Sequence, residues 1–377
     1  MRFTHRLPRL LLVIACSVAI LVSGAPVVDA CTGITLIAED GTLVYGRTLE
    51  WGAFDLKSRV MLIPRGHQFT GTTPDGQNGL RWTAKYGAAG IEVLERNVFG
   101  DGMNERGLTL GLFYHKGFAE YRDYDPAAAD RSVAPTDVGQ YLLTQFATVD
   151  EVRRGLDDFI VVTIVDPALG FAAPLHFMVS DPSGDQIVIE FRGGEAEVFE
   201  APLGVITNSP TYDWHMTNLR NYVNLSAVAL PAKEIESIDF APMGGGSGMI
   251  GLPGDFTPPS RFVRAVAWSQ TARPTKDGPE TIYELFRILD NFNVPLGAAE
   301  GSDDTDSPNP DGRSATIWTT ANDTRNRVIY YHTQHNRRVR RLQLDEIDFG
   351  AMGTDVIHLP LDEKKVQDIL DVTPIGQ

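Results

Sequence analysis

Cysteine is scarce in this sequence, which has two cysteines among 377 residues, Cys16 and Cys31. Small secreted domains that lack a large core are held by frameworks of several disulfides, and two cysteines cannot supply one. The length is sufficient for one large domain or two. No repeat, low-complexity stretch or interdomain linker interrupts the chain, and we therefore expect a single domain over residues 31–377.

Basic residues are also few, since 33 Lys and Arg face 49 Asp and Glu, which gives a formal net charge of −16. An acidic surface repels phosphates, so neither nucleic acid nor an anionic membrane is expected as a partner. Long hydrophobic runs are missing after Cys31, where no stretch approaches the ~20 apolar residues that a membrane helix requires. We therefore predict no membrane span in residues 31–377.

Residues 1–30 have the pattern of a secretory signal peptide. Three arginines and no acid stand in the first nine residues, an apolar stretch follows from 10 to 22, and Val28-Asp29-Ala30 has small residues at the positions that a signal peptidase reads. The alternatives are a retained anchor, for which the apolar stretch is short, and a lipoprotein signal ending at Cys16, which would leave a very short hydrophobic region. We predict cleavage after Ala30 and an exported protein, periplasmic or secreted.

Cleavage there would remove Cys16 and make Cys31 the first residue of the mature chain. A single cysteine in an oxidising compartment is unusual, because exported cysteines normally pair. Cys31 could be a small buried hydrophobic residue. Its position at the predicted cleavage point favours a chemical role instead.

The rest of the chain alternates between patterns typical of strands and of helices. Asp40-Gly41 between two β-prone runs indicates a hairpin, and Thr148 with Glu151 forms a capping box. Such a mixture with antiparallel turns predicts an α+β fold. Segment 118–134 has no clear period and is expected to be a loop. Strands are predicted at 34–38, 43–47, 60–64, 108–114, 175–180, 187–191, 314–320, 327–333 and 339–344, with another running into the turn at 205–210, and helices at 138–146, 148–156, 260–271 and 279–289.

Two segments resemble ligand-binding loops without meeting their requirements. The glycine-rich stretch 244–254 lacks the Gly-Lys-Ser/Thr ending and the preceding buried strand of a phosphate-binding loop. The acidic stretch 301–312 does not have the spacing of a calcium loop such as the EF-hand. We therefore expect neither a cofactor nor a metal.

A cysteine at position one carries a nucleophile and a base on the same residue. The thiolate is the reactive form of a thiol whose ordinary pKa is about 8.5, and a free α-amine titrates near ~8. The amine can therefore take the thiol proton directly or through one water. This chemistry suits amide hydrolysis through a thioester.

Such a site needs a cation near the sulfur, an acceptor for the amine and donors for the oxyanion. Arg47, at the end of the predicted hairpin, could return beside Cys31, or it could be a surface cation on an edge strand. Glu50 could hold the amine, or it could be solvent-exposed as glutamates usually are. Asn208 could donate to an oxyanion or make an Asx turn before Pro210. The residues alone favour the plain interpretation for Asn208 and Arg261.

Several motifs together resemble the choloylglycine hydrolase family, which includes penicillin V acylases and bile salt hydrolases among the N-terminal-nucleophile hydrolases. The likeness covers nearly all of the chain after the signal. The motifs are Cys-Thr-Gly at 31–33, Gly-Arg-Thr-Leu-Glu-Trp at 46–51, Thr-Asn-Ser-Pro at 207–210, Asn-Leu-Arg-Asn-Tyr at 218–222, Gly-Leu-Pro-Gly-Asp-Phe at 251–256 before Ser-Arg-Phe-Val-Arg at 260–264, and Phe-Asn-Val-Pro-Leu-Gly-Ala at 292–298.

The resemblance implies a four-layer αββα fold and a cysteine nucleophile exposed by processing. By this likeness Cys31 is the nucleophile with its freed amine as base, Arg47 lies near the sulfur, Asn208 is an oxyanion donor and Arg261 is the second arginine of the site. The family usually has Asp where this chain has Glu50, which is one methylene longer. This departure puts the geometry around the amine in question.

The resemblance also bears on substrate and assembly. Tyr114 lies at the position that helps shape the oxyanion hole, where bile salt hydrolases have Asn, and it is closer to penicillin V acylases. We therefore predict hydrolysis of a small N-acylated amide like penicillin V, with an N-acyl homoserine lactone or a conjugated bile salt as alternatives. Family members are often homotetramers. A non-catalytic binding protein on the same scaffold is the competing hypothesis, and a papain-like protease is disfavoured because the Cys-Gly-Ser-Cys-Trp context is absent.

Overall fold

The structure, a computed structural model, describes residues 31–52, 56–166, 170–295, 298–300 and 313–373. The predicted signal peptide and the whole acidic stretch 301–312 lie outside the described residues. Among the described residues, no helix is long and apolar enough to cross a bilayer.

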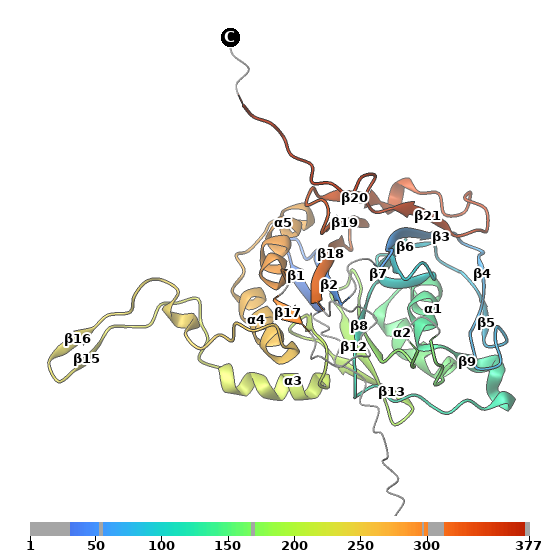
Figure 1. The fold of residues 1–377 in the computed structure, drawn as a ribbon, viewed down its shortest axis with the longest axis horizontal. Coiled ribbons are helices and arrows are strands. Elements are labelled where there is room, and N and C mark those ends of the chain that lie inside the picture. Colours follow the sequence, from blue (N-terminus) through green and yellow to red (C-terminus); the bar gives the residue numbers. More distant parts are fainter. Residues whose placement is uncertain (1–30, 53–55, 167–169, 296–297, 301–312, 374–377) are drawn as a thin grey trace, which may run out of the picture.

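Two antiparallel sheets lie face to face at the centre of the molecule (Figure 1). The first sheet has the order β14-β1-β2-β18-β19-β20, with β17 also paired to β18. Its strands are β1 (Thr32–Ile37), β2 (Leu43–Trp51), β14 (Val205–Ile206), β17 (Ala299–Glu300), β18 (Arg313–Asp323), β19 (Val328–Thr333) and β20 (Arg340–Gln343).

The second sheet has the order β13-β12-β11-β8-β7-β6-β3-β21. Its strands are β3 (Arg59–Ile63), β6 (Ala88–Val93), β7 (Val98–Asn104), β8 (Thr109–Tyr114), β11 (Leu175–Ser180), β12 (Gln186–Arg192), β13 (Glu195–Glu200) and β21 (Ile357–Pro360). Short two-stranded pairs lie outside the sheets: β4 (Gln68–Thr70) with β5 (Arg81–Thr83), β9 (Ser132–Val133) with β10 (Ile160–Val161), and β15 (Lys233–Ile235) with β16 (Ile238–Phe240).

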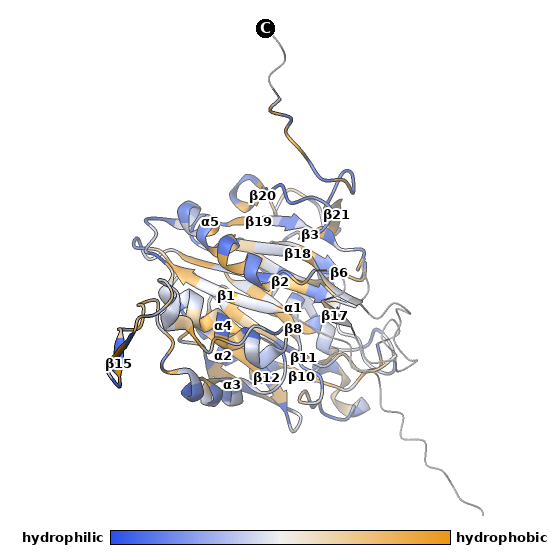
Figure 2. Ribbon diagram, turned by 60° about the vertical axis from the view of Figure 1, so that its left-hand side comes forward, coloured by the Kyte–Doolittle hydropathy of each residue, from blue (hydrophilic) through white to orange (hydrophobic). Residues whose placement is uncertain are grey.

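Helices cover the outer face of each sheet. The first sheet carries α4 (Pro258–Thr271) and α5 (Gly278–Leu289), and the second carries α1 (Val138–Gln145) with α2 (Val149–Gly155). The short α3 (Tyr212–Asn218) follows β14. Hydrophobic residues lie along both sheets, whereas hydrophilic residues colour the outer loops (Figure 2). The predicted αββα sandwich is confirmed.

The predicted elements are found with small changes of boundary, and the hairpin at 34–47 is the β1–β2 pair. The capping box is only half formed: Thr148 accepts from the Glu151 N–H at 3.2 Å, but Glu151 accepts from Ala147 instead of Thr148. The prediction of a loop at 118–134 was wrong in part, because this segment contains a 3-10 helix at Pro126–Arg131 and strand β9. The sequence patterns did not indicate β6, β7, β13, β21 or α3.

A long arm extends from the body between α3 and α4 and carries the β15–β16 pair at its tip (Figure 1). All six residues of this pair are exposed, including Ile235, Ile238 and Phe240. The fold of one chain does not bury these apolar side chains, so the arm is a candidate surface for contact with another molecule.

Candidate active site

Cys31 lies directly before β1, at a central position of the first sheet, and only 5% of it is exposed. The next residues pair with β2, since Thr32 faces Thr48 and Gly33 faces Arg47 across the ladder. Gly33 is required here, because a Cβ at this position would lie 2.7 Å from Cζ of Phe113. The Cys-Thr-Gly motif therefore places the thiol on a rigid strand between the two sheets.

Arg261 and Asn208 form a hydrogen-bonded network behind Cys31. The buried guanidinium of Arg261, on α4, donates from Nη1 to the carbonyl of Cys31 and, at 2.8 Å, to Oγ1 of Thr32. It also donates from Nη2 to Oδ1 of Asn208 at 2.8 Å. Asn208 in turn donates from Nδ2 to the carbonyl of Tyr114 at 2.9 Å. One chain of contacts thus joins the first sheet, α4 and the end of β8.

The Glu50 carboxyl is fully buried on β2. The carboxyl accepts hydrogen bonds from Oγ1 of Thr316 at 2.5 Å and from Oγ1 of Thr48 at 3.1 Å. The backbone carbonyl of Glu50 lies 3.9 Å from Sγ of Cys31. Burial raises the pKa of Glu50 to about 7, against the opposing effects of the Thr316 hydrogen bond and the Arg261 charge. The carboxyl can therefore exchange a proton near neutral pH. The interpretation as a solvent-exposed glutamate is wrong.

Arg47 is also fully buried and connects the two sheets. From β2 its Nη1 donates to the carbonyl of Gly100 on β7 at 2.8 Å and to the carbonyl of Leu112 on β8. Its guanidinium carbon lies 4.3 Å from the centre of the Phe113 ring. Nη2 has no hydrogen-bond partner in the part of the chain that the structure describes. A donor of this kind beside the thiol can stabilise a thiolate or a substrate oxygen, and the alternative of a surface cation is wrong.

Four of the predicted site residues, Cys31, Arg47, Glu50 and Tyr114, line one narrow cavity of about 70 Å³. Tyr114 is 5% exposed and packs edge-on against Trp51, with 5.6 Å between the ring centres. The other walls are mainly apolar, and the aliphatic and aromatic lining residues are Leu49, Trp51, Leu56, Val93, Leu94, Val98, Leu112, Ala173 and Leu175. Such walls favour an apolar group next to the thiol.

One ion pair also lines this cavity. Arg96 donates from Nη1 to both carboxylate oxygens of Asp166, at 2.5 and 2.6 Å. The Asp166 side chain is 7% exposed and the Arg96 side chain 37% exposed. The pair therefore reaches from the cavity toward solvent and supplies polar groups on otherwise apolar walls.

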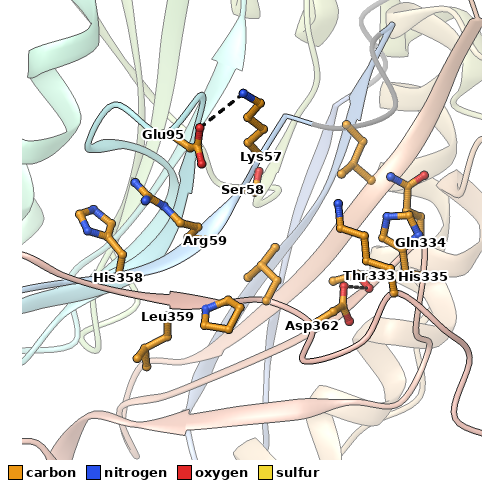
Figure 3. A pocket seen from close by; sticks show the side chains of 14 residues that line it. Lys57, Ser58, Arg59, Glu95, Thr333, Gln334, His335, His358, Leu359 and Asp362 are labelled. Atoms are coloured by element: carbon orange, nitrogen blue, oxygen red, sulfur yellow. Dashed lines mark hydrogen bonds and ion pairs between the residues drawn. The ribbon is translucent and has the colours of Figure 1, made fainter.

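A second cavity, of about 390 Å³, is larger but carries no comparable chemistry (Figure 3). Its walls are charged, and the charges are paired: Lys57 lies 3.6 Å from Glu95, and Asp362 forms an ion pair with Arg340 and accepts a hydrogen bond from Thr333 at 2.8 Å. Arg59 on the same wall is paired with Glu92. With no cysteine on its walls, this cavity offers no thiol nucleophile.

The structure brings all six predicted residues together, four on the cavity walls and two behind them. Sequence reasoning missed the threonines that hold the site. Thr48 stands two residues before Glu50 on the same strand, and the period of two could have placed it on the same face. Thr316 comes from a strand far along the chain, and no local pattern could have indicated its contact with Glu50.

The arrangement provides a thiol in an apolar cavity, a buried arginine with an unused donor, and an asparagine whose second amide N–H remains for a substrate oxygen. The Glu50 carboxyl, with a pKa near neutrality, belongs to a residue that lines the same cavity as the thiol. These groups are the requirements of acyl transfer to a cysteine: a nucleophile, a cation and neutral donors for an oxyanion.

Comparison with known proteins gives the same chemistry independently. Residues 31–359 match the family described as linear amide C-N hydrolases, choloylglycine hydrolase family. A bile salt hydrolase/transferase of Clostridium perfringens (strain 13 / Type A) is 31% identical over 323 residues, which cover 84% of this chain and 93% of that protein. A penicillin V acylase of Pectobacterium atrosepticum is 27% identical over 370 residues, 93% of this chain and 90% of the acylase.

Solved structures show the same fold. A variant of the conjugated bile acid hydrolase from Clostridium perfringens superposes with a TM-score of 0.78 at 26% identity, covering 91% of this chain and all of that one. The penicillin V acylase from Agrobacterium tumefaciens gives a TM-score of 0.69 at 26% identity, covering 88% and 92%.

Proposed function

Because the chain belongs to the choloylglycine hydrolase family of linear amide C–N hydrolases, we propose that it hydrolyses the amide bond of an N-acylated small molecule through a thioester on Cys31. The observation that carries this proposal is the place of Cys31, which lies against Arg47 and Glu50 in one apolar cavity. A family match that begins at residue 31 supports cleavage after Ala30, and with it a signal peptide and an exported enzyme.

The reaction begins when the freed α-amine of Cys31 accepts the thiol proton. The sulfur then attacks the carbonyl carbon of the substrate, the C–N bond breaks, and the amine product leaves with the proton that the α-amine returns. Water, activated by the same amine, attacks the thioester and releases the acid. Attacker and base belong to one residue, so no histidine is needed in the cavity.

The negative oxygen that forms during each attack needs donors that are already in place. The second Nδ2–H of Asn208 and the backbone near Tyr114 are suited to this role, because the hydrogen bond from Arg261 fixes the Asn208 amide with Nδ2 toward β8. Arg47 contributes positive charge through its unused Nη2. Donors that are held rigidly cost no reorganisation during the reaction, and each is typically worth about 10²- to 10³-fold in rate.

The substrate is proposed to carry a small or medium apolar acyl group, as penicillin V does. Tyr114 and Trp51 together narrow the cavity at the thiol with two aromatic rings, which suits a flat aromatic or short aliphatic acyl group. An N-acyl homoserine lactone, with a flexible acyl chain, and a conjugated bile salt are the alternatives. The narrow volume disfavours the rigid bile-acid skeleton.

The exposed arm is proposed to join copies of this chain into the homotetramer that the family resemblance implies. Its apolar tip residues Ile235, Ile238 and Phe240 are each about half exposed or more. A hairpin of two short strands is not stable in water by itself, and contact with another chain would supply the missing burial.

The experiment has two parts. Mass spectrometry of the exported protein should show Cys31 as the first residue. That protein should then hydrolyse penicillin V faster than an acyl homoserine lactone or glycocholate, with a trapped acyl-enzyme of the expected mass on Cys31. Tight binding of these compounds without acyl-enzyme or turnover would instead support the non-catalytic binding protein.

A further inference from the structure

Three buried side chains meet behind the turn that carries Asn208. His115 directly follows β8, His176 lies on β11, and Glu190 lies on β12, three strands that are neighbours in the second sheet. Their exposed fractions are 0%, 2% and 0%. The ligand atoms of all three lie within 4.8 Å of one another.

The distances in this cluster do not fit direct hydrogen bonds. Nε2 of His115 lies 3.7 Å from Oε1 of Glu190, and Nδ1 of His176 lies 3.6 Å from the same oxygen. Hydrogen bonds of this kind are about 2.7–3.2 Å long. Around a tetrahedral zinc ion with bonds of ~2.0–2.1 Å, neighbouring ligand atoms are ~3.3 Å apart. The two distances between a ring nitrogen and Oε1 of Glu190 therefore lie a few tenths of an ångström outside the spacing of ligands that share one ion, and all three ligand atoms lie within 4.8 Å of one another.

Several of these atoms also lack partners. Within the described residues, no hydrogen bond of good geometry reaches either ring nitrogen of His115, Nδ1 of His176 or Oε2 of Glu190. The backbone of Pro210 lies near the His115 ring, and Nη1 of Arg192 lies 3.9 Å from Oε2 of Glu190. Buried polar atoms of this kind cost free energy unless something binds them. The two imidazole rings stack in parallel, with centres 4.1 Å apart. Within the described residues no hydrogen bond of good geometry holds the His115 ring in this orientation, and the ring also stacks on Phe118, with centres 5.6 Å apart.

The surroundings orient the other two side chains. Nε2 of His176 lies 3.0 Å from the carbonyl of Thr207, so this nitrogen carries the proton and Nδ1 presents its lone pair to the cluster. Oε1 of Glu190 accepts from the N–H of Tyr212 at 2.7 Å. Metal-binding histidines are commonly fixed in this way, by a hydrogen bond from the far ring nitrogen to a backbone carbonyl.

Burial acts on all three groups of the cluster. It lowers the pKa of both His115 and His176 to about 3. It also raises the pKa of Glu190, against the opposing effect of Arg192, whose Nη1 lies 3.9 Å from Oε2 of Glu190.

We propose that His115, His176 and Glu190 bind a divalent transition-metal ion of the zinc class. Two imidazoles and a carboxylate suit zinc and its neighbours and disfavour calcium and magnesium, which prefer all-oxygen sites. The ion stabilises the segment from Thr207 to Tyr212, which carries Asn208, because His176 and Glu190 each hydrogen-bond to its backbone. It takes no part in acyl transfer, so the proposal does not depend on the substrate.

The test uses untagged protein that starts at Cys31, freed of metal by chelator and titrated with Co²⁺. Wild type should bind one Co²⁺ tightly, with visible absorption typical of nitrogen and oxygen ligands, and should melt at a higher temperature with Co²⁺ or Zn²⁺ than without. Glu190→Gln and His115→Phe should weaken binding by about 100-fold or more. His332→Phe, a change at a buried histidine outside the cluster, should bind Co²⁺ as wild type does.

Cys31→Ser separates this site from the thiol, because a thiolate ligand gives an intense charge-transfer band. Retention of the Co²⁺ spectrum in Cys31→Ser supports the proposal, and loss of the spectrum overturns it. The proposal is also overturned if wild type binds no Co²⁺, or if all variants bind it equally through exposed histidines. Should the His115 variant fail to fold, X-ray absorption of the wild-type Co²⁺ complex decides by the presence or absence of two imidazole ligands.

Discussion

Arg261 donates a hydrogen bond of 2.8 Å to Oδ1 of Asn208, and the same guanidinium holds the carbonyl of Cys31. The proposed nucleophile and the proposed oxyanion donor are therefore fixed relative to each other by one buried side chain. This relationship explains how two residues far apart in the sequence can act on one substrate carbonyl, and it makes the contribution of each residue measurable.

Cys31→Ser should reduce kcat for amide hydrolysis by at least ~1,000-fold, because a hydroxyl is far less acidic than a thiol and the α-amine cannot deprotonate it effectively. The fold should persist, since the two side chains are nearly the same size. Initial rates with penicillin V, together with circular dichroism, measure both effects. Equal activity of the variant and wild type would rule out the thioester mechanism.

Asn208→Ala should lower kcat by about 10²- to 10³-fold with a much smaller change in KM, because an oxyanion donor acts mainly in the transition state. Steady-state kinetics on the processed enzyme measure the two constants. Asn221→Ala, at an exposed asparagine outside the site, is the matched control and should behave as wild type. A loss confined to KM would assign Asn208 to substrate binding instead.

Glu50 should make stability depend on pH in a form of the protein that begins before Cys31. Its folded pKa of about 7 exceeds the ordinary value of 4.5, so the folded chain binds the proton more tightly than the unfolded chain does. The stabilisation relative to Glu50→Gln is complete below pH 4.5 and is lost as the pH rises through about 7, by up to ~3 kcal/mol. Urea unfolding of both proteins at several pH values measures this difference.

Two comparisons check the assignment of this effect to Glu50. Glu195→Gln, at an exposed carboxyl, should leave the pH dependence of unfolding unchanged. In protein that starts at Cys31, which has a free α-amine, the pH at which Glu50 loses its proton should be lower than in the longer form. The reason is that an ammonium group near the carboxyl favours the charged form of the carboxyl. A stability difference that grows with pH between 4.5 and 7 would contradict the prediction.

Arg47→Lys should lower the free energy of unfolding by about 2–4 kcal/mol, because an ammonium cannot reach both backbone carbonyls that the guanidinium joins across the sheets. Activity should also fall, since the charge near the thiol moves. Denaturant unfolding gives the free energy, with Arg122→Lys at an exposed ion pair as a control expected to change it by less than ~0.5 kcal/mol. Unaltered stability would show that the connection between the sheets is not important.

The double change Ile235→Lys and Phe240→Lys should reduce the mass of the assembled protein in solution without lowering the melting temperature of the single chain. Both side chains are exposed, so they add nothing to the core of one chain, and the proposed contact between chains would bury them. Light scattering after size-exclusion chromatography measures the mass. Glu234→Lys at the same tip adds charge without removing apolar surface, and an assembly that survives the double change would exclude the arm as its contact.

Side-chain patterns predicted the local elements of the fold, and the family resemblance predicted their arrangement as a sandwich. The β1–β2 hairpin, the two pairs of covering helices and the three strands near the end of the chain all follow from alternation, capping and turn residues. Strand β7 could not be recognised, because Gly100 and Gly102 interrupt its pattern and all of its residues are buried. Burial on both faces removes the alternation that identifies a strand.

The sequence predicted which residues form the site, but not the hydrogen bonds that join them. Motif resemblance selected Arg261 and Asn208, but the residues alone favoured a plain interpretation of both. The hydrogen bonds of Glu50 to Thr316 and of Asn208 to Tyr114 join segments separated by 266 and 94 positions. Contacts over such distances depend on how the two sheets are stacked, which no local pattern contains.

The two ends of the described chain differ in a way that matters for practical use. Cys31 is enclosed at the head of a central strand, whereas residues 363–373 are exposed and lead away from the body (Figure 1). The proposed mechanism needs a free α-amine on Cys31, and an affinity tag, a fusion partner or a solid support attached ahead of Cys31 would hold that nitrogen in an amide. Purification handles and immobilisation chemistry should therefore be placed at the carboxyl end.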